Sequence, residues 1–192
     1  MKERPILFSA PMVRAILDGR KSQTRRVAKE FDGRDNLDAI LRRFPNQKGC
    51  PYGEPGDRLW VRETWAQPAP LDPGPTVYRA DYPGCVPAGF ENIPPADAIR
   101  WKPSIHMPRA LSRITLEITG VRVERLQDIS VADALAEGVR VTYGEPFDAE
   151  HTIADRRRFE LVWKEINGAG SWESNPWVWV IEFARITTED GK

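Results

Sequence analysis

The chain has 192 residues, with 28 basic (Lys and Arg) and 28 acidic residues and a formal net charge of zero. This length suits one domain with its own core, and the balanced charge excludes a uniformly basic surface for nucleic acid, so attraction to phosphate must come from local clusters. The 17 Pro and 14 Gly, most of them between positions 45 and 108, exclude a helical bundle and favour an α+β or largely β domain with long loops.

The first expected elements are a short helix and a strand. The apolar run Pro5–Phe8 precedes Ser9, which is placed to cap a helix whose apolar residues follow helical spacing over 13–17. Gly19 is expected to end this helix. Ser22–Val27 then reads as a strand that emerges directly from a basic turn.

The middle of the chain is expected to be loop-rich around one strand. Residues 28–56 are expected to form an insertion that is mostly loop and contains an amphipathic helical piece over 37–44. The stretch "DRLWVRETWA" (57–66) has the Trp, Val and Thr content of a strand. Residues 67–108 are dense in Pro, with brief extended pieces at "TVYRA" and "AIRWKP".

The last third carries the clearest periodicity. "SRITLEITGVRVERLQDI" alternates as a strand that bends or bulges at Gly120. Ser130 and Asp133 form a capping-box pattern before "VADALAEG", a longer helix is expected over 153–166, and "NPWVWVIEFARI" closes the chain as a strand. We therefore expect an α+β fold: a small barrel or curled sheet of five to six strands with peripheral helices and long loop insertions.

The basic stretch "GRKSQTRR" (19–26) is the first candidate site. Strand alternation puts Ser22, Thr24 and Arg26 on one face, where two hydroxyls and a guanidinium suit a base edge and a phosphate. Lys21 meets Thr24 only if it lies in the turn before the strand, and it then acts as a base only if its pKa falls. The alternative is a solvated basic edge that discourages pairing between sheets.

Three further residues are candidate ligand contacts. Glu63 shares a strand face with apolar residues, so it is either a strand-end carboxylate or a buried pocket acid. Trp65 lies beside a polar loop where a base could stack on it, and His106 lies in a Pro-flanked loop where it contacts a ligand or is structural. No metal site is expected, because the cysteines and histidines form no close pair: Cys50, Cys85, His106 and His151.

The basic stretch resembles the G-x-K-x-x-E-x-R signature of ASCH domains, a branch of the PUA-like barrel proteins, through Gly19, Lys21 and Arg26. Thr24 stands where that signature has Glu, which is similar to the bacterial ASCH amidohydrolases that act on N4-acetylcytidine with a Lys, a Thr and a Glu. The best match for the third residue is Glu137, with Asp133 as the fallback. The segments "GDRLWVRETWA", "KPSIHMPR" and "NPWVWVIEF" resemble ASCH proteins of phages and prophages.

The resemblance implies a single PUA-like domain over residues 1–187, with insertions at about 28–56 and 67–108 and a disordered tail at 188–192. It also implies an amidohydrolase on N4-acylated cytosine nucleosides or a related modified base. Thr24 would be the nucleophile and Lys21 the general base, and Glu137 would either orient Lys21 or shuttle the proton to the leaving amine. The alternatives are a non-catalytic module that binds RNA or a modified base, and a metal-independent ribonuclease.

The remaining expectations concern partners and location. A nucleoside or nucleic acid is the expected partner, with RNA favoured over DNA, and no cofactor or membrane contact is expected. The start "MKERPILFSAPM" has only a short apolar run that Pro11 interrupts, and two cysteines give no disulfide framework, so a cytoplasmic protein is expected. The oligomeric state is left open.

Overall fold

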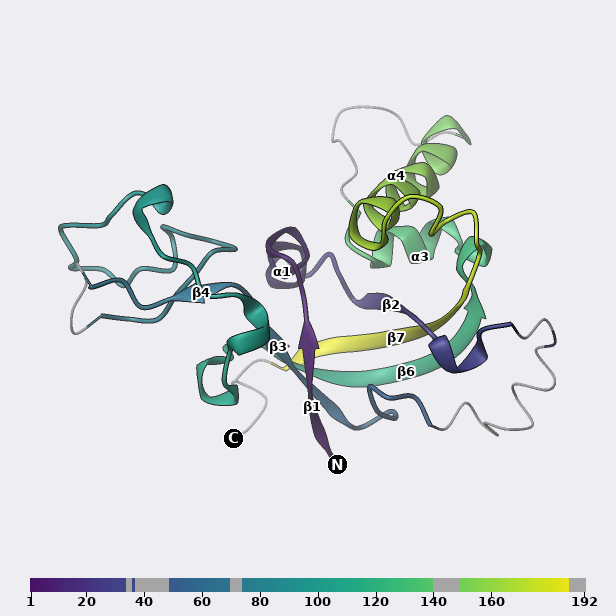
Figure 1. The fold of residues 1–192 in the computed structure, drawn as a ribbon, viewed down its shortest axis with the longest axis horizontal. Coiled ribbons are helices and arrows are strands. Elements are labelled where there is room, and N and C mark those ends of the chain that lie inside the picture. The colour runs from purple at the N-terminus through teal and green to yellow at the C-terminus, as the bar shows by residue number, and fades with distance from the viewer. Residues whose placement is uncertain (34–35, 37–48, 70–73, 140–148, 187–192) are drawn as a thin grey trace.

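The structure is a computed structural model that describes residues 1–33, 36, 49–69, 74–139 and 149–186 (Figure 1). The strands are β1 (Glu3–Leu7), β2 (Gln23–Val27), β3 (Arg58–Arg62), β4 (Trp65–Ala66), β5 (Val77–Tyr78), β6 (Thr115–Arg125) and β7 (Trp177–Ile186). The α-helices are α1 (Ala10–Leu17), α3 (Val131–Ala136) and α4 (Ala149–Asn167). Short 3₁₀ turns lie at Lys29–Phe31, Ala96–Ala98, Ser104–His106, Arg109–Leu111 and Leu126–Asp128.

The main sheet has the strand order β1-β3-β6-β7-β2, so the first two strands of the chain form its two edges. β1 and β3 pair in parallel and the other neighbours pair antiparallel, which confirms the expected mixed α+β class. Among the described residues no backbone ladder joins β1 to β2, but the Arg26 guanidinium of β2 donates a 2.7 Å hydrogen bond to the Leu7 carbonyl of β1. Closure into a barrel stays a prediction.

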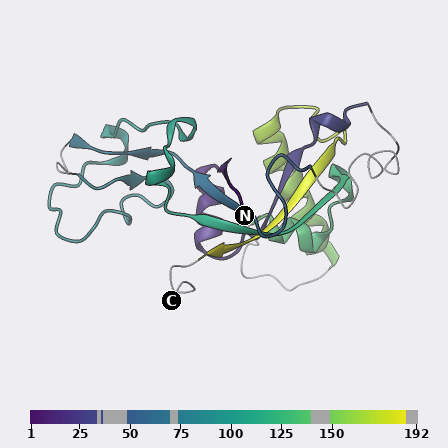
Figure 2. The same ribbon diagram turned by 90° about the horizontal axis from the view of Figure 1, so that it is seen from below.

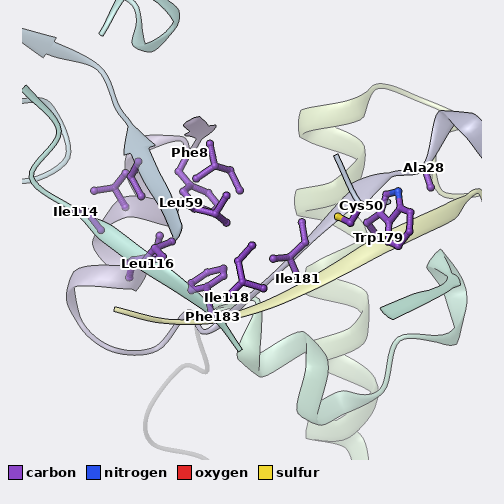
Figure 3. Packing of buried hydrophobic residues seen from close by; sticks show 14 of the residues in the cluster. Phe8, Ala28, Cys50, Leu59, Ile114, Leu116, Ile118, Trp179, Ile181 and Phe183 are labelled. Atoms are coloured by element: carbon purple, nitrogen blue, oxygen red, sulfur yellow. The ribbon is translucent and has the colours of Figure 1, made fainter. Parts of the chain in front are cut away.

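Alternation along the strands builds two apolar layers, one on each face of the sheet. The first packs one sheet face against α1 and the 50–53 turn, as Figure 3 shows for Phe8, Leu59, Ile118 and Phe183. The second packs Val178 and Val180 of β7 against α3 and α4. Because the β2–β7 register pairs Thr24 with Ile181 and Arg25 with Val180, Thr24 faces the first layer and Arg25 the second.

A separate lobe follows β3. It contains the β4–β5 pair and a small apolar cluster of its own around Ala66, Val77 and Ile99. The lobe projects from one end of the main sheet, away from α3 and α4 (Figures 1 and 2). It occupies much of the expected 67–108 insertion, which is therefore a structured unit rather than a simple loop.

Several expected elements appear with shifted limits. The strand expected over 57–66 divides into β3 and β4, because residues 63 and 64 leave the main sheet and turn into the lobe. The helix expected over 153–166 starts earlier, at Ala149, and two of its apolar side chains, Val162 and Ile166, are 37% and 50% exposed. These side chains do not join the core that Phe159 and Trp163 enter.

Other expectations are confirmed. The ladder between β6 and β7 shifts register between Ile118 and Gly120, where the bend was predicted. Ser130 and Asp133 form the predicted capping box at the start of α3. The helical piece expected over 37–44 and the expected tail at 188–192 lie outside the described residues. None of the helices in the described part of the chain is long and apolar enough to cross a membrane.

Candidate functional site

Lys21 lies in the turn between α1 and β2. Gly19 has a φ of +73°, and the backbone N–H groups of Arg20 and Lys21 both donate to the Ala15 carbonyl, at 2.8 and 2.9 Å. Lys21 then forms an isolated antiparallel bridge with Glu137 instead of joining β2. This turn gives Lys21 the position that the sequence required if its side chain was to approach the strand start.

The Lys21 ammonium is fully enclosed, with a side-chain exposure of 0%. Nζ donates to the Gln23 carbonyl at 2.7 Å, to the Glu137 carbonyl at 2.9 Å and to Glu137 Oε2 at 2.7 Å. Since an ammonium has three N–H donors, these contacts use all of them. Burial lowers the pKa of Lys21, and the Glu137 carboxylate opposes that shift.

Glu137 is the carboxylate that reaches this lysine, and it does so from the end of α3. As the C-cap residue of α3 it accepts from Lys21 through Oε2 and from Arg25 Nη1 through Oε1, at 3.1 Å. Gly138 permits the approach, because a Cβ there would lie 2.8 Å from the Ala15 Cβ and 2.9 Å from the Lys21 Cβ. Any larger residue at position 138 would push Glu137 and Lys21 apart.

Asp133, the fallback residue, serves a different purpose. Its Oδ2 accepts from the Ser130 hydroxyl at 2.7 Å, and its Oδ1 pairs with Arg122 at 2.7 Å. Hydrogen bonds from Ser130 and Gln23 and the charges of Arg25 and Arg122 outweigh the effect of burial and hold the pKa of Asp133 at about 2. Asp133 is therefore a capping and ion-pairing group at the rim of the Lys21–Glu137 pair.

Thr24 and Arg26 point to the same face of β2, as the alternation predicted. Thr24 is 1% exposed, and no hydrogen bond joins its hydroxyl to Lys21 within the described chain. The Phe8 ring links the two basic groups: Lys21 Nζ lies 5.7 Å and Arg26 Cζ 5.2 Å from its centroid. Burial lowers the pKa of Arg26. Ser22 lies between Lys21 and β2 with an exposed side chain.

Two hollows flank these residues. The larger, of about 870 Å³, lies between α1 and the ends of α3 and α4, and Glu137 and Gly138 form part of its wall. The smaller, of about 200 Å³, lies at the edge of the sheet beside Arg26, Tyr52 and Arg62. Lys21 and Thr24 line neither hollow.

Glu63 belongs to another buried cluster. Arg113 donates to both of its carboxylate oxygens, at 2.9 and 3.0 Å, and also to both oxygens of Asp81, at 2.7 and 2.9 Å. Burial raises the pKa of Glu63, while burial of Arg113 is outweighed by its two acidic partners, so the pKa of Arg113 is raised. This cluster ties the lobe to the main sheet, and within the described part of the chain no hydrogen bond or ion pair joins it to Lys21 or Thr24.

Trp65 and His106 also lie at the lobe. Trp65 is 6% exposed, and Lys102 Nζ stands 4.4 Å from its ring centroid, so its face is covered. His106 is exposed at the end of the 3₁₀ turn Ser104–His106. Among the residues that the structure describes, no group of His, Cys, Asp and Glu is arranged to hold a metal ion.

Sequence reasoning missed three residues of this region. Arg25 donates a hydrogen bond to the Glu137 carboxylate that also binds Lys21. The ring of Phe8 contacts the cationic groups of Lys21 and Arg26. Arg62 lines the smaller hollow together with Arg26. The strand alternation put Arg25 and Arg62 on definite faces, but it gave no signal for what those faces meet. Such contacts between distant segments are set by the packing of α3 onto the sheet and by the pairing of β1 with β3 at the edge of the sheet.

No family model matches this chain, and no curated protein matches it. Among solved structures, the chain is similar to the ASCH domain from Lactobacillus crispatus JV V101, known from a high-resolution crystal structure, with a TM-score of 0.39 and 14% sequence identity. The match covers 96% of this chain and 79% of that chain. At that TM-score and identity, the likeness transfers no residue role and no activity to this chain.

Proposed function

We propose that this protein is an amidohydrolase that acts on N4-acylated cytosine nucleosides or a related modified base. The observation that carries the proposal is the buried Lys21–Glu137 ion pair, at 2.7 Å, in which the lysine lies three positions before the buried, hydroxyl-bearing Thr24. A buried ion pair is a poor way to stabilise a fold, because desolvation offsets its attraction. Buried titratable groups with shifted pKa values gather instead at sites that perform chemistry.

In the proposed reaction Thr24 is the nucleophile. Its Oγ1 forms a bond to the acyl carbon while its proton passes to Lys21 Nζ. The tetrahedral adduct then loses its bond to N4, which leaves with that proton. Water hydrolyses the ester on Thr24, so that a carboxylic acid and the free hydroxyl are restored. The net reaction converts the acylated base and one water into the amine and the acid.

Lys21 must first release a proton in order to accept one. Burial favours that release because it lowers the pKa of the ammonium, and the carboxylate oxygen Oε2 of Glu137, at 2.7 Å from Nζ, is placed to take the proton. Arg25 opposes the transfer, because its own contact with Glu137 stabilises the carboxylate form. Glu137 thus orients Lys21 and, on this proposal, holds its proton in turn.

A binding module for RNA or a modified base is the second candidate. The specific observation in its favour is that all three N–H groups of Lys21 are already used, which is typical of a permanently charged structural ammonium. In that case Lys21 and Glu137 hold the edge of β2 in place, and Thr24 and Arg26 contact a ligand without reacting with it.

The test is to incubate the protein with N4-acetylcytidine and to measure the release of cytidine by chromatography. We expect release by the native protein and a loss of at least about a hundredfold in both Lys21→Met and Thr24→Val, since each removes a group needed for proton transfer or attack. Thr24→Ser keeps a hydroxyl and should retain part of the rate. Thr119→Val is the matched control, because Thr119 is an exposed threonine on β6 and its loss should leave the rate unchanged.

The opposite result is equally clear. If the native protein releases no cytidine but retains RNA in a salt-dependent assay, with all variants folded by circular dichroism, the amidohydrolase is rejected. The binding module then stands in its place.

A further inference from the structure

The smaller hollow is built where the two edge strands of the sheet approach each other. It is lined by Pro5, Ile6, Leu7, Arg26, Tyr52 and Arg62 and has a volume of about 200 Å³. Leu7 and Arg62 are paired in the β1–β3 register, and the Leu7 carbonyl accepts from Arg26 of β2. Because drug-sized ligands occupy about 300–1,000 Å³, this hollow suits one compact group rather than a whole nucleoside.

Arg26 and Arg62 bring two positive charges to this small space, and no carboxylate among the described residues forms an ion pair with either of them. By contrast, Arg25, Arg113 and Arg122 each have at least two acidic partners. Arg26 and Arg62 donate instead to the backbone carbonyls of Leu7 and Ile105. A carbonyl satisfies one N–H group but leaves the positive charge uncompensated.

Arg62 also has one N–H donor that no acceptor satisfies within the described chain. Its Nε is buried and has no hydrogen-bond partner among the described residues. A buried N–H without a partner costs about 1–3 kcal/mol, so a group that supplies an acceptor at this place is favoured. An anion with several oxygens meets both needs, because it brings acceptors and negative charge together.

We propose that this hollow is a phosphate site, in which Arg26 and Arg62 hold the phosphate of a nucleotide or of a nucleic-acid strand. Tyr52 lines the same space, and its side chain carries a hydroxyl that can donate a hydrogen bond. Arg26 is two residues from Thr24 on one face of β2, so its Cα lies about 7 Å along the strand from that of the proposed nucleophile. The inference rests on the proposed function for that neighbour, and it names the substrate class as phosphorylated rather than free nucleoside.

Binding measurements test the site without any need for turnover. The probes are cytidine 5′-monophosphate, cytidine and inorganic phosphate, titrated by calorimetry at low salt. We expect the monophosphate to bind the native protein about ten- to a hundredfold more tightly than cytidine, and Arg62→Gln to remove most of that difference. Arg62→Lys should keep part of it, because an ammonium is a point charge without the planar fork.

Arg109→Gln is the matched control. Arg109 is an arginine whose Cζ lies 6.0 Å from the centroid of the Trp60 ring, but it pairs with Glu3 and does not line the hollow. Its loss should change neither affinity by more than about twofold. Equal affinity of the native protein for the monophosphate and for cytidine would overturn the site, and so would an Arg62→Gln variant that is folded and binds like the native protein.

Two further arms separate the outcomes. A short oligocytidine without terminal phosphates that competes with the monophosphate, and loses affinity in Arg62→Gln, identifies the strand backbone as the source of the phosphate; failure to compete identifies the mononucleotide. If phosphate binding depends on Arg62 but N4-acetylcytidine 5′-monophosphate is not hydrolysed, the site holds and the amidohydrolase fails. If the acetylated nucleoside and its monophosphate are hydrolysed equally well and Arg62→Gln changes neither rate, the phosphate site fails and the amidohydrolase holds.

Discussion

Glu137 and Glu63 are both buried, at 8% and 1% exposure, and both pair with basic side chains, at 2.7 and 2.9 Å. Their surroundings differ. Glu63 meets one planar guanidinium through both oxygens, and that Arg113 uses its remaining donors on Asp81. Glu137 divides its oxygens between Lys21, in the turn before β2, and Arg25, on β2 itself.

On the proposed function, the difference between the two clusters corresponds to a structural role for Glu63 and a chemical role for Glu137. The Glu63 cluster joins residues that lie next to β3, β5 and β6, and the arginine in it stays charged at any accessible pH. The Glu137 cluster contains a lysine, whose proton can leave, and Thr24 follows that lysine by three positions and is also buried. We therefore expect changes in the first cluster to act on stability and changes in the second to act on activity.

The largest expected effect is on stability, in Arg113→Met. Removing this guanidinium leaves Glu63 buried without a counter-charge, and we expect the free energy of unfolding to fall by about 3–5 kcal/mol. Urea denaturation measures the loss. Arg109→Met, which removes an arginine from an exposed ion pair with Glu3, should cost less than about 1 kcal/mol. A cost for Arg113→Met as small as that of the control would refute the structural role.

The next effect is in Lys21→Met, where Glu137 loses one partner but keeps Arg25. Because the carboxylate is still paired, we expect a smaller loss of stability, about 2 kcal/mol, together with the loss of at least about a hundredfold in activity. In Arg113→Met the remaining folded fraction should keep its activity per molecule. Equal losses of specific activity in the two variants would erase the distinction between the clusters.

The sequence predicted the local features of the Lys21 region, but it did not predict the contacts that join distant segments. Period-2 alternation placed Thr24 and Arg26 on a common face, and Gly19 placed Lys21 in the turn before the strand; both are local patterns that a few residues determine. The contact of Lys21 with Glu137 spans 116 positions, and no periodicity encodes it. It entered only through the resemblance to a family.

The role of Glu63 shows the same limit. The sequence indicated that Glu63 shares a strand face with apolar residues, so a buried acid was one of two alternatives. Its partner Arg113, however, is 50 positions away, in the segment before β6. Without that partner, a buried carboxylate looks like a ligand contact. The hollow beside Arg62 was unpredictable for the same reason, since it exists only where two edge strands, distant in order along the sheet, come together.

Asp133→Asn tests whether Asp133 is separate from the proposed chemistry. A pKa of about 2, against an ordinary value of 3.8, means that the ionised form contributes about 2 kcal/mol of stability. For a carboxyl with a lowered pKa, this contribution is present above pH 3.8 and is lost as the pH falls through about 2. We expect Asp133→Asn to be about 1–2 kcal/mol less stable at pH 7, a difference that disappears near pH 2 by thermal denaturation, with activity unchanged.

The smallest effect concerns the proton on Lys21 itself. Because burial lowers its folded-state pKa below the ordinary 10.5, the unfolded chain binds more protons in the window between the two values. The stability of the native protein relative to Lys21→Met should therefore rise as the pH approaches 10.5, as measured by urea denaturation between pH 7 and 10.5.

Lys164 is the control in the same experiment, because its pKa is shifted in the opposite direction from that of Lys21. Hydrogen bonds to Glu160 and Glu173 raise its pKa, so its contribution is present below 10.5 and is lost only at higher pH, and the native protein should gain nothing over Lys164→Met as the pH rises to 10.5. A flat curve for Lys21→Met over the same range would mean that Lys21 holds its proton as firmly as an ordinary lysine. A general base cannot do so, and Lys21 would then belong with Arg113 among the fixed structural cations.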